Sequence, residues 1–143
     1  MERQTIIKIL DFLEKEDNVK HPKRDNLIWK ISFGFPLTKE ELNHKGDLRL
    51  SFSNLTFLPK GLKVGGFLYL FMCRYLTSLP EGLKVGGILS LNYSSVTSLP
   101  KGLEVGGDLE IEDTALTKYS DEELREMVKP GFIKGNIIRR KTR

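Results

Sequence analysis

Residues 79–100 read LPEGLKVGGILSLNYSSVTSLP, and nearly the same string precedes and follows them in the chain. The Leu-Pro pair recurs at spacings of 21 and 20 residues, at Leu58-Pro59, Leu79-Pro80 and Leu99-Pro100. A Gly-Gly pair recurs at the same spacings, at Gly65-Gly66, Gly86-Gly87 and Gly106-Gly107. Self-similarity at a fixed period of about 20 residues is the signature of a repeat protein. These repeats therefore decide the fold of the middle of the chain.

Each unit holds a short alternation of apolar and polar residues, followed by a piece rich in Pro and Gly. The alternation predicts a short strand with one buried face. It occurs at Leu48 and Leu50, at Leu68 and Leu70, at Leu89 and Leu91, and at Leu109 and Ile111. Because Pro lacks an N–H and restricts the residue before it, we expect the second half of each unit to be extended or a tight turn. We expect the Val-Gly-Gly corner to supply glycines with positive φ that bend the chain into the next strand.

Three units are complete, at residues 46–65, 66–86 and 87–106, and a partial fourth spans 107–117. A unit of this length cannot bury its leucines alone. Stacked neighbours bury them in one continuous column, so the units predict a solenoid.

The units resemble leucine-rich repeats. Leu48-x-Leu50-x-x-Ser53-x-Leu55 follows the signature of that family, as do residues 89–96 and 109–116. The family places Asn, Cys, Ser or Thr at a ladder position whose side chain bonds the turning backbone. Here that position holds Ser53, Cys73, Ser94 and Thr114. The Leu-Pro pair is similar to the short bacterial subtype of secreted effectors, and the near-identical units are similar to small repeat proteins of bacteriophages.

The resemblance covers residues 46–117. It implies an α/β-type solenoid with one mostly parallel sheet of about six short strands, a convex side of irregular turns and helical caps at both ends. One departure from the family is that Gly65, Gly86 and Gly106 stand where a leucine is usual.

Residues 1–45 are expected to form an N-terminal cap of helix, strand and helix. Residues 4–16 predict an amphipathic helix with the apolar residues Ile6, Ile9, Leu10 and Leu13. Asp25 to Phe33 alternate as in a strand, with Leu27, Trp29, Ile31 and Phe33 on one face. Thr38 to Glu41 fit a capping box that starts a short helix.

Residues 118–143 are expected to form the C-terminal cap and a basic tail. Ser120 to Glu123 fit a second capping box, and the helix is expected to run to about Lys129. Pro130-Gly131 stops it, and Phe132 to Ile138 can add a final strand.

The composition excludes several classes of protein. With one Cys and two His, the chain has no internal disulfide and no structural zinc set. No apolar run approaches the roughly 20 residues of a membrane helix, and the N-terminus does not resemble a signal peptide. We therefore expect a cytoplasmic protein with no membrane partner, located in the host cell cytoplasm if a phage encodes it.

The sequence also lacks motifs for catalysis. It has no phosphate loop of the Gly-x-x-x-x-Gly-Lys type and no nucleophile elbow. His21 and His44 lie in polar stretches without an evident catalytic partner, and Cys73 occupies the structural ladder position. We predict a protein that is not an enzyme and that holds no cofactor and no metal ion.

The residues between the paired leucines are expected to point outward across the open face of the sheet. In the second unit these are aromatic, namely Phe67, Tyr69 and Phe71, with Ile88 and Asn92 beside them in the third. Arg49 lies on one side, and an acidic row formed by Asp108, Glu110 and Glu112 lies on the other. Exposed aromatic residues with a polar rim are typical of protein interfaces.

We therefore expect a non-enzymatic protein-binding module whose partner carries a basic and apolar patch. The resemblance to phage repeat proteins extends this to an inhibitor of a host protein, such as a defence protein. The same face could instead join two copies of the chain or be covered by a terminal helix.

A further alternative is nucleic acid held by the tail. The net charge of +4 comes from the last ten residues, since the rest of the chain has 18 positive and 19 negative side chains. The basic tail residues are Lys134, Arg139, Arg140, Lys141 and Arg143, of which the last four form the nucleic-acid alternative. The acidic row does not favour phosphate on the sheet face itself.

Overall fold

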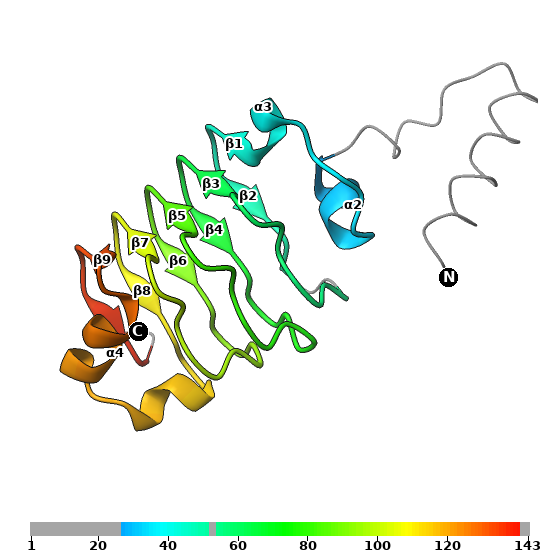
Figure 1. Ribbon diagram of the computed structural model, residues 1–143. Helices are drawn as coiled ribbons and strands as arrows, with labels where there is room; N and C mark the ends of the chain where they lie inside the picture. Colours follow the sequence, from blue (N-terminus) through cyan, green and yellow to red (C-terminus); the bar gives the residue numbers. More distant parts are fainter. Residues whose placement is uncertain (1–26, 52–53, 141–143) are drawn as a thin grey trace, which may run out of the picture.

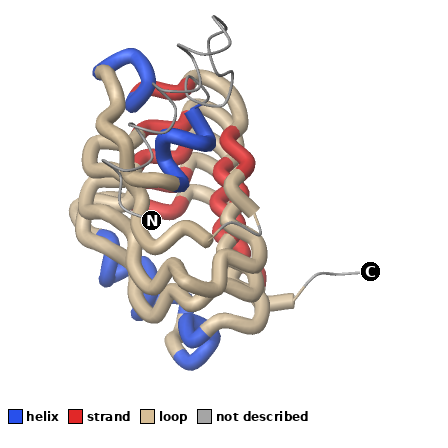
Figure 2. The backbone as a smooth tube through the Cα atoms, turned by 90° about the vertical axis from the view of Figure 1, so that its right-hand side faces the viewer, coloured by secondary structure: helices blue, strands red, loops and turns tan. Residues whose placement is uncertain are grey.

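The computed structural model describes residues 27–51 and 54–140, which form a parallel-strand β-solenoid (Figure 1). Each turn of the chain contributes one two-residue strand to each of two parallel sheets, which appear as two columns of short strands in Figure 2. Sheet A contains β1 (Asn43–His44), β3 (Lys63–Val64), β5 (Lys84–Val85), β7 (Glu104–Val105) and β9 (Phe132–Ile133). Sheet B contains β2 (Leu48–Arg49), β4 (Leu68–Tyr69), β6 (Leu89–Ser90), β8 (Leu109–Glu110) and β10 (Ile137–Ile138).

Sheet B confirms the strands expected at the paired leucines, and sheet A corrects the expectation of one sheet with about six strands. The part of the structure that is described has two sheets of five strands each. The Lys-Val or Glu-Val piece after each Gly-Leu is extended, and these pieces stack in register, as Lys63 does on Lys84 and Lys84 on Glu104. Their backbone groups bond between turns, so this piece of each unit forms a regular ladder. The rest of the side that was expected to be irregular has no strand or helix, at residues 54–62, 70–83 and 91–103.

The core lies between the two sheets. The paired leucines of sheet B face inward and are buried, and the valines of sheet A meet them from the other side. Leu68, Leu70 and Leu89 have no exposed surface. Stacking of the turns thus buries side chains that a single turn would leave in water.

The Gly-Gly corners have a different role from the one expected. The positive φ angles belong to the glycines after each Leu-Pro, with values of 82° at Gly61, 75° at Gly82 and 78° at Gly102. At Gly86 φ is not positive, but a Cβ atom added there would overlap the carbonyl oxygen of Gly65 in the preceding turn. Glycine is needed at this corner because the backbones of successive turns approach too closely for a side chain.

The N-terminal described segment is helical where a strand was expected. Helix α2 (Leu27–Ser32) buries Ile31, and Trp29 stacks on Phe35 with ring centroids 5.0 Å apart. Leu27 and Ile31 are four residues apart, which brings them to the same face of a helix and lets both pack on the core. The expected helix over residues 4–16 lies outside the described residues.

The two capping boxes are confirmed. Helix α3 (Lys39–Leu42) has the reciprocal bonds between Thr38 and Glu41, and helix α4 (Asp121–Val128) has those between Ser120 and Glu123. The backbone N–H of Thr38, followed by the Lys30 side chain, holds the pKa of Glu41 below its ordinary value. A 3-10 helix (Ala115–Lys118) precedes α4.

Helix α4 is tied to the last turns of the solenoid. It buries Leu124 and Val128, and the Val128 carbonyl accepts a bond of 2.8 Å from the N–H of Gly102. The final strand expected in residues 132–138 is in fact two strands, β9 in sheet A and β10 in sheet B. None of the helices within residues 27–51 and 54–140 is long and apolar enough to span a bilayer.

Candidate functional site

The strand register of sheet B arranges the residues singled out from the sequence into three rows that cross its strands. The middle row is Arg49, Tyr69, Ser90, Glu110 and Ile138. The row before it is Asp47, Phe67, Ile88, Asp108 and Asn136. The row after it is Ser51, Phe71, Asn92, Glu112 and Arg140. We refer to these rows together as the sheet B face.

Aromatic rings gather at the second turn of this face. Phe67 and Tyr69 meet edge to face, with centroids 5.8 Å apart and an interplanar angle of 87°. Phe71 meets Tyr93 in the same way at 5.4 Å and 74°. The guanidinium of Arg49 lies 4.9 Å from the centre of the Tyr69 ring. We name Phe67, Tyr69, Phe71 and Tyr93 the aromatic cluster.

The rings of the aromatic cluster are partly exposed to solvent and are held in place by contacts with one another and with Arg49. Phe67 and Tyr93 are each 37% exposed, and Tyr69, Phe71 and Ile88 are half-buried. Edge-to-face ring pairs and an arginine over a ring hold these side chains in defined orientations. The rings can therefore contact a second molecule and lose little side-chain entropy in doing so.

Tyr93 was missed by the sequence analysis because it follows the alternating strand residues. Its φ is 60°, and Met72 and Asp113 have similar values at the matching positions of the neighbouring turns. This left-handed residue ends the alternation and turns the chain, so a period of two cannot predict where the Tyr93 ring points. A signal for this turn was present in the sequence, because each unit has one residue, such as Tyr93, between the last outward residue of the strand and the ladder residue.

Asn92 was expected to face a partner, but it is buried, with 2% of its surface exposed. Its Nδ2 donates to Glu110 Oε1 at 3.1 Å, and its Oδ1 accepts from the N–H of Glu112 at 2.8 Å. Asn92 therefore supports the acidic row and is covered by its neighbours. Ser90 is covered as well, with 3% exposed.

The three carboxylates of the acidic row each have a partner within the protein. Asp108 accepts from the N–H of Asn136 at 2.8 Å, as Asp47 does from the N–H of Phe67. Glu112 accepts from the Tyr93 hydroxyl at 3.2 Å. The charge of Glu112, and then this bond, raises the pKa of Tyr93 above its ordinary value. The row thus forms an ordered acidic border beside the aromatic cluster.

One residue of the basic tail, Arg139, contacts other residues of the protein. Arg139 pairs with Asp121 at 2.7 Å and donates to the carbonyl of Thr117 at 3.0 Å. Arg140 is exposed and lies two residues after Ile138, the strand partner of Glu110, so it lies next to Glu112 in the row. Lys141 and Arg143 lie outside the described residues. Lys134 belongs to the other side of the molecule, next to sheet A.

The ladder position is buried in all three turns that are described there. Cys73 Sγ donates to the carbonyl of Leu50 at 3.2 Å, and Thr114 Oγ1 donates to the carbonyl of Ile111 at 2.7 Å. Ser94 Oγ has no hydrogen-bond partner among the described residues. His44 Nε2 lies 2.9 Å from the carbonyl oxygen of Asp47, whereas Ser53 and His21 lie outside the described part.

Among residues 27–51 and 54–140, no three carboxylate, thiol or imidazole groups gather into a possible metal site. Comparison of the chain with protein-family models, with curated proteins and with solved structures finds no match.

Proposed function

We propose that this protein is a non-enzymatic binding module that holds a partner protein on the sheet B face. The observation that carries the proposal is the aromatic cluster, in which two edge-to-face ring pairs and a stacked arginine present partly exposed rings on a regular scaffold. Tyr, Phe and Arg are among the residue types that are enriched at protein interfaces, and Tyr and Arg often dominate the binding energy. Exposed rings gathered in one patch are typical of interaction sites, whereas single exposed aromatic residues are common on protein surfaces.

The acidic row defines the kind of partner. The alternate residues Asp108, Glu110 and Glu112 lie on and beside β8, two strands from β4 and Tyr69. The border of a partner that binds to the rings therefore contacts these carboxylates. A partner with an apolar centre and a basic border complements this arrangement. Arg49 and Ile88 would contact the centre of such a partner, and Asn92 would act through the carboxylates it supports.

The repeats belong, in this proposal, to the leucine-rich type, with α3 and α4 as caps of the solenoid. Buried Leu-x-Leu pairs and buried Cys73, Ser94 and Thr114 at the ladder position support this assignment. The resemblance to phage repeat proteins extends the proposal to a blocked host protein, such as one used in defence.

The test is capture of a partner from nuclease-treated lysate by wild type and by the triple variant Phe67→Ser, Tyr69→Ser, Phe71→Ser. The matched control is Phe57→Ser, Tyr75→Ser, because these aromatic residues are 58% and 62% exposed and lie outside the sheet B face. We expect a protein that binds wild type and the control and binds the triple variant at least about tenfold more weakly. Circular dichroism must show that all three proteins are folded.

Two alternative functions predict other results. If the face joins two copies of the chain, sedimentation velocity shows a dimer for wild type and a monomer for the triple variant, and no other protein is retained. If the basic tail holds nucleic acid, deletion of residues 139–143 abolishes binding of a labelled oligonucleotide, and the affinity of the intact chain falls steeply with salt. Equal retention of a partner by wild type and the triple variant would contradict the proposal.

A further inference from the structure

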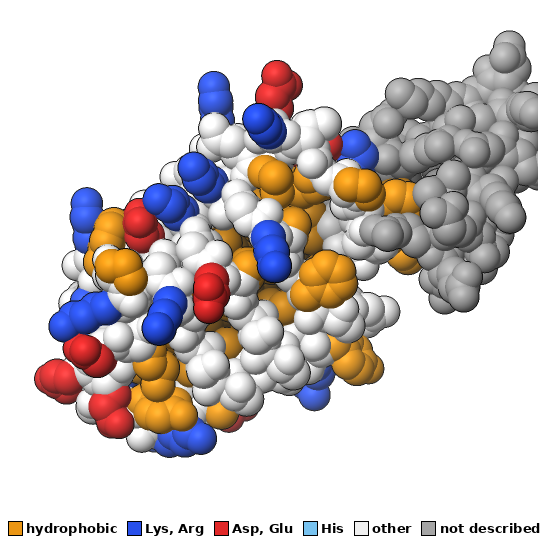
Figure 3. Space-filling model, viewed as in Figure 1, with side chains coloured by type: hydrophobic (Ala, Val, Ile, Leu, Met, Phe, Trp, Pro, Cys, Tyr) orange, Lys and Arg blue, Asp and Glu red, His pale blue; other side chains and the backbone are white. Residues whose placement is uncertain are grey.

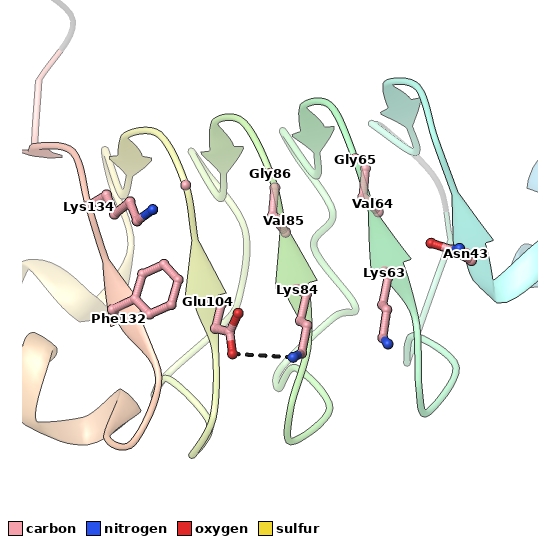
Figure 4. A pocket seen from close by; sticks show the side chains of 11 residues that line it. Asn43, Lys63, Val64, Gly65, Lys84, Val85, Gly86, Glu104, Phe132 and Lys134 are labelled. Carbon is pink, nitrogen blue, oxygen red and sulfur yellow. Dashed lines mark ion pairs between the residues drawn. The ribbon is translucent and has the colours of Figure 1, made fainter.

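The outer side of sheet A carries a groove that the proposed binding by the sheet B face does not use. It has a volume of about 340 Å³ and crosses sheet A from β1 to the segment after β9. In Figure 4 the side chains of Lys63, Lys84, Glu104 and Phe132 stand in a row on successive strands, and Gly65 and Gly86 lie beside this row.

The floor of the groove is bare backbone because the fold requires it. A Cβ atom on Gly65, Gly86 or Gly106 would overlap the carbonyl oxygen of the preceding turn. The next position along the chain is also glycine in each of these turns, so the strip without side chains is two residues wide. The N–H groups of Gly86 and Gly106 donate to the preceding turn at 2.7 and 2.8 Å. The floor therefore offers a flat surface whose N–H groups are already satisfied.

The wall of the groove is positively charged. Lys63 and Lys84 line it, and Lys134 lines its end in the same row as the glycines, since Ile133 pairs with Val105. Lys45 holds the position of that row in the first turn, since its neighbour His44 pairs with Val64. Among the residues that line the groove, Glu104 supplies the one carboxylate, which pairs with Lys84 at 3.3 Å. Figure 3 shows Lys and Arg side chains along this side of the molecule. The groove thus keeps an excess of positive charge after that pairing.

We infer that this groove binds an extended acidic peptide segment of a partner protein, which lies across the strands of sheet A. Four strand spacings of about 4.8 Å separate Asn43 from Phe132, which both line the groove, so the groove is about 19 Å long and matches about six extended residues. Carboxylates of the segment pair with the lysines, and its backbone lies on the glycine floor. Phe132 is 38% exposed at one end, with Lys134 Nζ 5.3 Å from its ring centre, and provides an apolar contact.

The same features favour a peptide over a nucleic acid. Binding of single strands depends on several aromatic rings on which successive bases stack, and the lining residues of this groove include one ring, Phe132. Glu104 stands between Lys84 and Phe132 in the row, where it would repel a phosphate chain. An extended peptide needs less width and can place an apolar or neutral residue beside Glu104.

The experiment measures the fluorescence anisotropy of a labelled octapeptide of alternating Asp and Glu on addition of the full chain. The groove variant is Lys63→Glu, Lys84→Glu. The control is Lys60→Glu, Lys101→Glu, which makes the same change of charge at exposed lysines that do not line the groove. Glu104→Gln removes the opposing carboxylate. A labelled ten-nucleotide single strand and an octapeptide of Gln and Ser are the comparison probes.

We expect wild type to bind the acidic octapeptide with an affinity that falls as salt rises. The groove variant should bind at least about tenfold more weakly, the control should stay within about threefold of wild type, and Glu104→Gln should bind more tightly. Circular dichroism establishes that each variant is folded.

The inference is overturned if the groove variant and the control lose the same affinity, since diffuse charge would then explain binding. It is also overturned if wild type binds the nucleotide strand and not the acidic peptide, or does not distinguish the acidic peptide from the neutral one. The triple variant of the aromatic cluster should bind the acidic octapeptide as wild type does, because the two surfaces belong to different sheets.

Discussion

Sheets A and B have the same number of strands, the same strand length and the same parallel stacking, yet their outer sides carry opposite kinds of residue. Sheet A ends in glycine pairs and is lined by lysines, whereas sheet B carries aromatic rings and a row of carboxylates. The two surfaces are separated where the chain passes from sheet A to sheet B. There the turns lie so close that side chains are excluded, and the outward positions of sheet B are the first to be free of this restriction.

The comparison predicts that the glycine corner is the part of the solenoid least tolerant of change. Gly86→Val places a Cβ atom on the carbonyl oxygen of Gly65, so we expect it to lose more than about 3 kcal/mol or to fail to fold. Gly82→Ala is the control, because φ there is 75° but nothing lies within 4 Å of the added atom. That variant should lose about 1–2 kcal/mol from backbone strain alone. Urea unfolding measures both, and equal losses would show that close stacking is not what selects glycine.

Substitutions in the core between the sheets should cause the next largest loss of unfolding free energy. Leu70 has no exposed surface, so Leu70→Ala should lose about 2–5 kcal/mol of unfolding free energy through lost burial and the cavity left behind. Tyr75→Ala serves as the control, since Tyr75 is 62% exposed, and should change stability by about 0.5 kcal/mol or less. A loss well under 1 kcal/mol at Leu70 would mean that the inside and outside of sheet B have been exchanged.

The outer side chains should have the smallest effects, and these should differ between the sheets. Tyr69→Ser removes a ring contact and the arginine over the ring, so we expect a loss of about 0.5–1.5 kcal/mol. Lys84→Ser removes an exposed ion pair with Glu104 and should change stability by about 0.5 kcal/mol or less. Thermal unfolding at matched ionic strength compares the two. A larger loss at Lys84 would reverse the expected order.

The solenoid, the strands of sheet B and both capping boxes could be predicted because each depends on a local pattern. Leu-x-Leu fixes which face of a strand is buried, and Ser120 with Glu123 fixes a helix start within four residues. The strands of sheet A carry a similar apolar-polar-apolar pattern, as in Leu62-Lys63-Val64, but the Pro and Gly residues on either side of it favoured a turn. These strands exist because neighbouring turns pair, which depends on the whole stack.

The residues of the candidate site could likewise be predicted where they depend on a local pattern, and not where they depend on contacts between turns. Phe67, Tyr69 and Phe71 lie on one face because they share the period of a strand, and the structure keeps them together with Ile88 and Arg49. Asn92 is buried, contrary to the expectation, because its side-chain amide bonds to two residues of the next turn. The spacing of residues within one unit does not predict such contacts between turns. The lysine groove was missed because its floor consists of residues without side chains, and charge counts along the chain drew attention to the tail.

The glycine corner also bears on how the array can change in length. In the interior of the stack each glycine pair meets the glycine pair of the next turn, so one junction is chemically the same as another. A gene segment that encodes one whole unit could therefore be duplicated or deleted between these junctions without any new contact having to evolve. Each such event would widen or narrow the surface on both sheets by one strand.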